Sequence, residues 1–277
     1  MAVDERVVCL GDNCLDLYLP PVDRVLVGGS VLNVAVGLAR RGLRATYVGP
    51  VGADQGGQVV LSELASQGVD WSHVRSVAGE TTAETEIALG HGGERRFLHE
   101  RYAIHETYDP SEGEWAFLAR ARNVHASRLS RHLERLLSLG ADGAFLSYDF
   151  SVGELPRRLD GLELAFLPHD RLVPGVDPEQ SARELVQRGC HCAVVTLGAE
   201  GSIASTASEL RSVPARPLVS VVDTCGAGDA FIAAFIVARM AGKPLEACLE
   251  DGAAAGAEAC SYIGAFPQEP LPALARV

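Results

Sequence analysis

Short apolar segments alternate with longer amphipathic segments along most of the chain. Residues 7–10 and 45–51 form the first two apolar segments, and a glycine-rich loop and an amphipathic stretch at 30–42 lie between them. Short apolar runs are typical of buried strands, and apolar positions three or four residues apart are typical of helices. Further strands are expected at 123–126, 144–149, 165–167 and 193–197, and further helices at 59–67, 114–122, 130–138, 178–188, 230–240 and 247–260. This alternation predicts an α/β fold with a mostly parallel central sheet and helices on both faces.

Residues 81–102 follow a different pattern. Thr85, Ile87 and Leu89 alternate with polar or small residues, and a second segment, 95–101, follows the turn at 91–94. Alternation with a period of two predicts a β-hairpin with one polar face.

A glycine-rich stretch at residues 223–229 reads Asp-Thr-Cys-Gly-Ala-Gly-Asp. The apolar run 218–222 before it predicts a buried strand, and the Ala- and Phe-rich segment after it predicts a buried helix. Glycines allow a tight turn, and the first turn of a helix offers free N–H groups and a positive dipole end, so this stretch predicts an anion-binding loop. Asp229 would lie beside the anion, where a carboxylate can take a proton from an attacking hydroxyl during phosphoryl transfer. From these residues alone, a simple turn with an acidic helix start remains an equal alternative.

The same stretch resembles the Asp-Thr-x-Gly-Ala-Gly-Asp signature of the PfkB, or ribokinase-like, carbohydrate kinases. The resemblance implies a three-layer α/β/α fold with a small β lid, and an enzyme that uses ATP and Mg²⁺ to phosphorylate a sugar hydroxyl. It makes Asp229 the catalytic base and Gly226, Ala227 and Gly228 the anion hole. The lid would come from about residues 15–27 and 81–102, would exclude water, and would provide a possible homodimer contact.

Two N-terminal stretches extend the resemblance to the acceptor site. Gly11 to Tyr18 reads Gly-Asp-Asn-Cys-Leu-Asp-Leu-Tyr, and Gly28 and Gly29 precede Asn33 with the spacing of the family's first signature. The resemblance implies that the substrate-binding residues are Asp12, Asp16, Gly28, Gly29 and Asn33, with Asp16 binding sugar hydroxyls. Without it, the polar residues after the first strand would be read as a capped turn.

Other segments resemble the nucleotide side of these kinases. Residues 196–201 match a Thr-Leu-Gly-x-x-Gly element, which implies that Thr196, Gly198 and Gly201 contact ATP, and Thr224 is assigned to the nucleotide as well. Asp223, with the Gly-Ala pair at 264–265, is a possible potassium site. The chain departs from the family after the strand that ends near Leu167. It reads Pro-His-Asp-Arg-Leu where Asn-x-x-Glu usually organises magnesium, so the metal site is in doubt. Asp170 could replace that pair only in part, and either the rate is modest or the ATP phosphates hold most of the magnesium.

Length, composition and charge limit the domain organisation, the partners and the location that we expect. The 277 residues fit a single domain, 1–277, and the apolar fraction of 47% indicates a sizeable core. A formal net charge of −12 argues against a nucleic-acid partner. The seven cysteines lack disulfide or zinc spacing, so buried free thiols are expected. The N-terminus has no signal-peptide pattern and no uncharged run is long enough to span a membrane, so we expect a cytoplasmic protein without a membrane partner.

The acceptor is less constrained than the reaction. Residues 11–18 and the Tyr-x-Gly-Ala ending are similar to those of the fructoselysine 6-kinases, which implies phosphorylation of the 6-hydroxyl of fructoselysine or a related fructosamine. A free ammonium group would favour acidic side chains in the pocket, and candidates are Asp12, Glu84, Glu86 and Glu100. Ribose, fructose, 2-keto-3-deoxygluconate and nucleosides remain open, as does a phosphorylated acceptor if Arg95, Arg96 and Arg101 were to bind it. A catalytically weak sugar-binding regulator is an alternative. A dinucleotide-dependent oxidoreductase is disfavoured because the Gly-x-Gly-x-x-Gly spacing is absent.

Overall fold

The computed structural model describes residues 6–90, 92–127, 132–172 and 175–272. Residue 91 of the expected turn at 91–94 and the start of the expected helix at 130–138 lie outside these ranges. Among the described residues, a large sheet has nine strands in the order β13-β12-β11-β10-β9-β8-β1-β4-β5. The strands are β1 (Arg6–Leu10), β4 (Arg44–Gly52), β5 (Asp70–Val77), β8 (Asn123–Ser127), β9 (Phe145–Asp149), β10 (Leu164–Pro168), β11 (Cys192–Thr196), β12 (Ser202–Thr206) and β13 (Leu210–Val213). The neighbouring strands β11, β10, β9, β8, β1, β4 and β5 are parallel to one another, whereas β12 pairs antiparallel with both β11 and β13.

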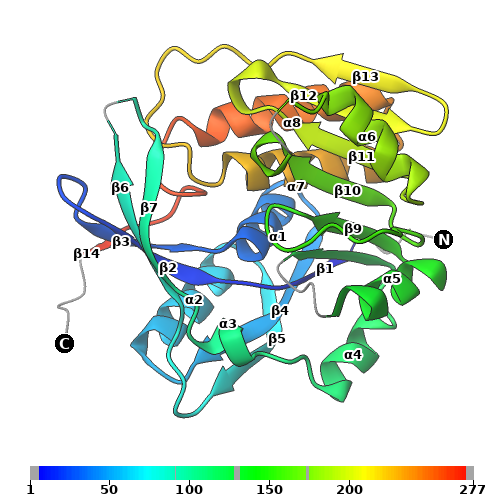
Figure 1. Ribbon diagram of the computed structural model, residues 1–277. Helices are drawn as coiled ribbons and strands as arrows, with labels where there is room; N and C mark the ends of the chain where they lie inside the picture. The colour runs from blue at the N-terminus through cyan, green and yellow to red at the C-terminus, as the bar shows by residue number, and fades with distance from the viewer. Residues whose placement is uncertain (1–5, 91, 128–131, 173–174, 273–277) are drawn as a thin grey trace.

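Side chains of the large sheet alternate between two hydrophobic cores. On β1, Val7 and Cys9 belong to one core, while Val8 and Leu10 belong to the other. The first core packs against α1 (Ser30–Arg40), α2 (Gln55–Ser66), α7 (Ala227–Met240) and α8 (Leu245–Ala259). The second packs against α4 (Glu112–Leu118), α5 (Leu133–Ala141) and α6 (Pro178–Gln187). Strands buried on both faces explain the continuous apolar runs of the sequence, and the layers are helix, sheet, helix as predicted (Figure 1).

A second, smaller sheet forms the expected lid and has the strand order β14-β3-β2-β6-β7. Its strands are β2 (Cys14–Tyr18), β3 (Arg24–Gly28), β6 (Glu84–Leu89), β7 (Arg95–Arg101) and β14 (Leu271–Pro272). Figure 1 shows β6 and β7 projecting away from the large sheet. On the inner face of this lid, Tyr18, Leu26 and Ile87 pack with Cys225 of the glycine loop in one buried cluster. The lid therefore rests directly on the loop that precedes α7.

The expected strand at 218–222 is wrong. This segment has no regular structure, and all five of its residues are exposed, with Leu218 40% and Val219 fully exposed. Leu218 and Val221 instead line a large cavity. These two apolar side chains therefore belong to the wall of the cavity and not to the hydrophobic core.

Smaller differences concern strands and helix ends. The sequence did not predict β5, β12, β13 or β14, and α4 ends at Leu118 rather than at 122. All seven cysteines are free, and six are buried. No described helix has the length and apolar character needed to cross a membrane. The single-domain boundary and the cytoplasmic location stay predictions.

Candidate active site

The predicted site residues gather where the strand order changes direction. From β1 the chain continues to β4 and β5 on one side, while β8 to β11 lie on the other. In parallel sheets, the carboxyl ends of strands on either side of such a point leave a crevice for ligands. Asp12 follows β1, Asp149 ends β9, and the glycine loop lies against the same edge because Asp229 is close to both.

The glycine loop forms the start of α7. Gly226 precedes the helix with a φ of 70°, and a Cβ there would lie 2.4 Å from that of Ala265, so glycine is required at this position. A Cβ on Gly228 would meet nothing within 4 Å, because this residue borders the large cavity. The first turn of α7 has the free N–H groups and the positive end that an anion-binding position needs, and the anion hole at Gly226, Ala227 and Gly228 stays a prediction.

Asp229 lies in the first turn of α7 and is held by two side chains of α1. Asn33 Nδ2 donates to Asp229 Oδ2 at 2.7 Å, and Ser30 Oγ donates to Oδ1 at 3.0 Å. Burial, together with the nearby charge of Asp149, raises the pKa of Asp229 to about 7, although the bonds from Asn33 and Ser30 act in the opposite direction. The carboxylate is therefore a stronger base than an ordinary aspartate, whose pKa is about 3.9.

Two members of this group were not predicted from the sequence. Ser30 Oγ also lies 3.3 Å from Asp149 Oδ2, so its single proton serves either carboxylate. Asp149 in turn accepts from Ser151 N at 2.9 Å and Ser151 Oγ at 2.7 Å. For Asp149 the sequence did offer a signal, because it is a polar residue at the end of the predicted strand 144–149, much as Asp12 follows the predicted strand 7–10.

The paired glycines before α1 allow close packing around the predicted acceptor residues. A Cβ on Gly28 would lie 2.2 Å from Asp16 Oδ2, and one on Gly29, which has a φ of 107°, would lie 2.3 Å from Asn13 Cα. Asp16 is only 4% exposed and accepts from Cys14 Sγ at 3.2 Å. Burial raises its pKa to about 7. Asp16 is close to the glycine loop, since Cys225 Sγ lies 3.9 Å from Oδ2.

A cavity of about 310 Å³ lies between the end of β1 and the lid. Its charged lining residues are Asp12, Glu100, Arg101 and Glu106. Asp12 Oδ1 and Oδ2 accept from Val31 N at 3.1 Å and Ser30 N at 3.3 Å, so Asp12 also caps the start of α1, a contact that the sequence did not reveal. Asp16 is not among the residues that line this cavity.

The expected acidic residues of β6 are placed differently. Thr85 of β6 lines the cavity, whereas Glu84 and Glu86 are its neighbours on the strand and do not. Successive strand residues face opposite sides of a sheet, so the two glutamates face away from the cavity. Glu84 pairs with Arg101 at 2.6 Å.

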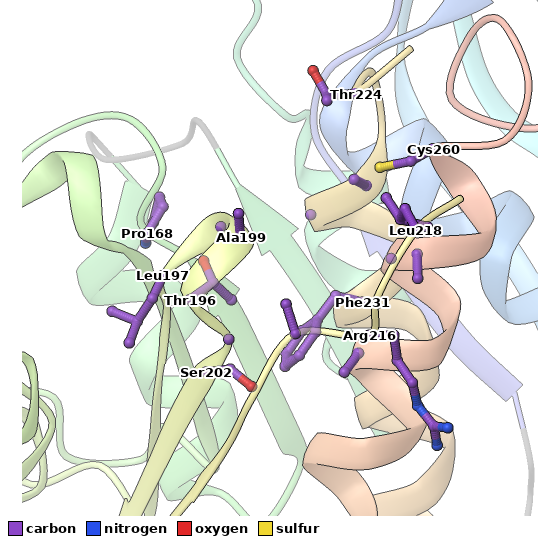
Figure 2. A pocket seen from close by; sticks show the side chains of 18 of the residues that line it. Pro168, Thr196, Leu197, Ala199, Ser202, Arg216, Leu218, Thr224, Phe231 and Cys260 are labelled. Atoms are coloured by element: carbon purple, nitrogen blue, oxygen red, sulfur yellow. The ribbon is translucent and has the colours of Figure 1, made fainter. Parts of the chain in front are cut away.

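A larger cavity of about 750 Å³ lies between the end of β11 and the helices α7 and α8 (Figure 2). All four predicted nucleotide residues, Thr196, Gly198, Gly201 and Thr224, line it. Figure 2 shows Thr196 and Ala199 on one side and Leu218 and Phe231 on the other. Such a slot, apolar on one side and ending at the anion-binding turn, suits a flat base with a phosphate chain.

Arg95 of the lid reaches the rim of the larger cavity. Its Nη1 donates to Thr224 O at 2.6 Å, and Thr224 N donates to Gly93 O at 3.1 Å. Arg95 and Arg101 lie at opposite ends of β7, and Arg101 pairs with Glu84, so these two predicted lid arginines are separated. They do not form one cluster for a phosphorylated acceptor.

The expected magnesium and potassium positions differ in how well the residues present there suit the metal. Asp170 lies in the short helix η2 (His169–Arg171) and lines the larger cavity. The described residues contain no cluster of three acidic, histidine or cysteine side chains suited to a metal. Magnesium at kinase sites needs only one or two carboxylates together with substrate phosphates, so Asp170 fits such a role. Asp223 accepts bonds from Tyr18 Oη, Cys225 N and Gly264 N, and its potassium role stays a prediction.

Comparison with known proteins agrees with this geometry. Residues 5–144 and 163–272 match the family model described as pfkB family carbohydrate kinase. Fructoselysine 6-kinase of Escherichia coli K12 is 33% identical over 268 residues, covering 95% of this chain and 100% of that protein. The structure of Arabidopsis thaliana ribokinase with ribose and ATP aligns with a TM-score of 0.80 at 26% identity, covering 94% of this chain and 93% of that one. A fructokinase double mutant from Vibrio cholerae O395, bound to fructose, ADP and potassium, aligns with a TM-score of 0.77 at 21% identity, covering 94% and 93%. The chain therefore has the ribokinase-like fold, belongs to the PfkB family of carbohydrate kinases and is an ATP-dependent sugar kinase.

Proposed function

We propose that this kinase transfers the γ-phosphate of ATP to the 6-hydroxyl of a fructosamine such as fructoselysine. The observation that carries the proposal is the charge of the residues that line the smaller cavity: Asp12, Glu100 and Glu106 are acidic, and the arginine among them, Arg101, is already paired with Glu84. A neutral sugar needs no such excess of acid, whereas an amine adduct carries ammonium groups that carboxylates bind well. The similarity to fructoselysine 6-kinase supports the same acceptor class.

In the proposed reaction, Asp229 takes the proton of the acceptor hydroxyl. The hydroxyl oxygen forms a bond to the γ-phosphorus while the bond from that phosphorus to the bridging oxygen of ADP breaks. Asn33 and Ser30 hold the Asp229 carboxylate in place through their bonds of 2.7 and 3.0 Å. The N–H groups at the start of α7 stabilise the charge on the transferring phosphoryl oxygens.

Magnesium, when bound with ATP, neutralises phosphate charge, and Asp170 would hold it or one of its waters. The lid would exclude water from the acceptor side. The bonds of Arg95 and Gly93 to Thr224 support this, since they join the lid turn to the glycine loop. Water exclusion matters because water competes with the sugar for the phosphoryl group.

The test is magnesium-dependent ADP release with fructoselysine, another fructosamine, ribose, fructose and 2-keto-3-deoxygluconate. We expect turnover with the fructosamines, lost in Asp229→Asn. Glu100→Gln should raise KM for fructoselysine about tenfold, because it removes one charge from the ammonium pocket. Glu86→Gln is the matched control, since this glutamate does not line the cavity. Higher kcat/KM for a neutral sugar would reject the fructosamine proposal, and sugar binding without turnover on any acceptor would favour a regulatory protein.

A further inference from the structure

The carboxylate of Asp223 is fully buried where the lid, the glycine loop and the chain after α8 meet. Its Oδ1 accepts from Cys225 N at 2.8 Å. Its Oδ2 accepts from Gly264 N at 2.9 Å and from Tyr18 Oη at 2.5 Å. A buried carboxylate is tolerated only when such bonds replace its hydration, and three donors from three segments do so here.

Tyr18 is the one side-chain donor among these three, and it comes from lid strand β2. Tyr18 is 3% exposed and packs with Leu26 and Ile87 in the inner cluster of the lid. A tyrosine hydroxyl is protonated at neutral pH, so Tyr18 donates its proton to Asp223 Oδ2.

These contacts fit poorly with a potassium ion at Asp223. Potassium in proteins is held by oxygen lone pairs, whereas Cys225 and Gly264 present N–H hydrogens to the carboxylate and Tyr18 presents an O–H hydrogen. A cation placed on Oδ2 would face the positive ends of two of these dipoles. Asp223 Oδ1 accepts one bond, from Cys225 N, whereas Oδ2 accepts two.

We propose that the Tyr18 hydroxyl takes the place of a monovalent cation at Asp223, so that the anion-binding loop forms without potassium. The bond also makes Tyr18 a positioning residue that couples the lid to the loop. Asp223 begins the loop, and Gly264 belongs to the segment whose Ala265 packs against Gly226. Removing the hydroxyl would leave the buried carboxylate with one hydrogen-bond donor fewer, beside the anion hole.

The test compares potassium chloride with tetramethylammonium chloride at equal ionic strength, for the wild type and Tyr18→Phe. For the wild type we expect the same Tm and the same kcat in both salts. For Tyr18→Phe we expect kcat in tetramethylammonium to fall about tenfold or more, the loss caused by removing one bond to a buried charge, with Tm and kcat partly restored by potassium. Tyr47→Phe is the control, because its buried hydroxyl donates to Gly11 O at 2.8 Å. It should lose stability without gaining a potassium response.

A potassium-specific rise in the wild-type Tm or kcat would overturn the proposal, and so would a Tyr18→Phe variant with unchanged kcat in both salts. The proposal rests on the kinase fold and not on the fructosamine acceptor. The Tm comparison needs no acceptor, and a wrong acceptor would lower kcat equally in both salts. The two failures are therefore distinguishable, even if Tyr18→Phe fails to fold.

Discussion

The base strength of Asp229 is set by its neighbours rather than by its residue type. Burial and the charge of Asp149 raise its pKa to about 7, and the bonds from Asn33 and Ser30 act against this rise. A general base is most effective when its pKa lies near the working pH, since it is then both unprotonated and basic. The sequence identifies the carboxylate but not this tuning, because Ser30 and Asp149 are distant from Asp229 in the chain.

The first prediction concerns the pH dependence of catalysis. The rate kcat/KM for the acceptor should fall as the pH drops below about 7, because a protonated Asp229 cannot accept the hydroxyl proton. Asp149→Asn should move this limb to lower pH by removing a charge that raises the pKa, and Ser30→Ala should move it to higher pH. Rate profiles between about pH 5 and pH 9 measure both shifts. Shifts in the same direction for the two variants would contradict this account.

The second prediction concerns stability. The folded pKa of Asp229, about 7, lies above its ordinary value of 3.8, so folding favours the protonated form. The stability from this group is present below pH 3.8 and is lost as the pH rises through 7. Asp229→Asn should therefore raise Tm by a few degrees at pH 8 while reducing turnover by about two to four orders of magnitude. Thermal melts at pH 5 are the control, where the gain in Tm should shrink. An equal gain at both pH values would mean that ionisation is not its cause.

Strands and helices that pack against the protein itself, on both faces or on one face, were predictable from the sequence. Segments that face a ligand were less predictable. Periodicity identified β1, β4 and α1 because their apolar positions pack against the protein itself. It failed at 218–222, where apolar residues line a cavity. An apolar run has the same appearance whether it covers a core or a ligand, and only the surrounding structure distinguishes them.

The third prediction tests this interpretation of residues 218–222. Leu218→Ser should raise KM for ATP several-fold, because it removes apolar contact from the nucleotide cavity. It should leave Tm almost unchanged, since Leu218 is already 40% exposed. Val219→Ser is the matched control, because Val219 is fully exposed and does not line the cavity. A large fall in Tm for Leu218→Ser would instead indicate a role in the core.

In the whole molecule, the two cavities lie on either side of the start of α7. Thr224 and Gly228 border the larger cavity, while Asp12 lines the smaller one and lies near Asp229. The resemblance to PfkB kinases was sufficient to predict which motifs meet here. It did not predict the contacts that Tyr18 and Arg95 make with the glycine loop, since no motif records contacts between the lid and the loop.

The fourth prediction concerns the proposed homodimer through the lid. Strand β7 is an edge of the small sheet, and its Phe97 and Leu98 are 49% and 51% exposed. An exposed apolar edge strand favours pairing with another chain. We expect a mass near twice 29.3 kDa by light scattering, and a shift towards the monomer in Leu98→Lys, since a charge there disfavours edge pairing. Trp71→Lys is the control, because Trp71 is similarly exposed but lies on β5, at the edge of the other sheet. A monomeric wild type, or a dimer disrupted only by Trp71→Lys, would place the lid edge outside any dimer contact.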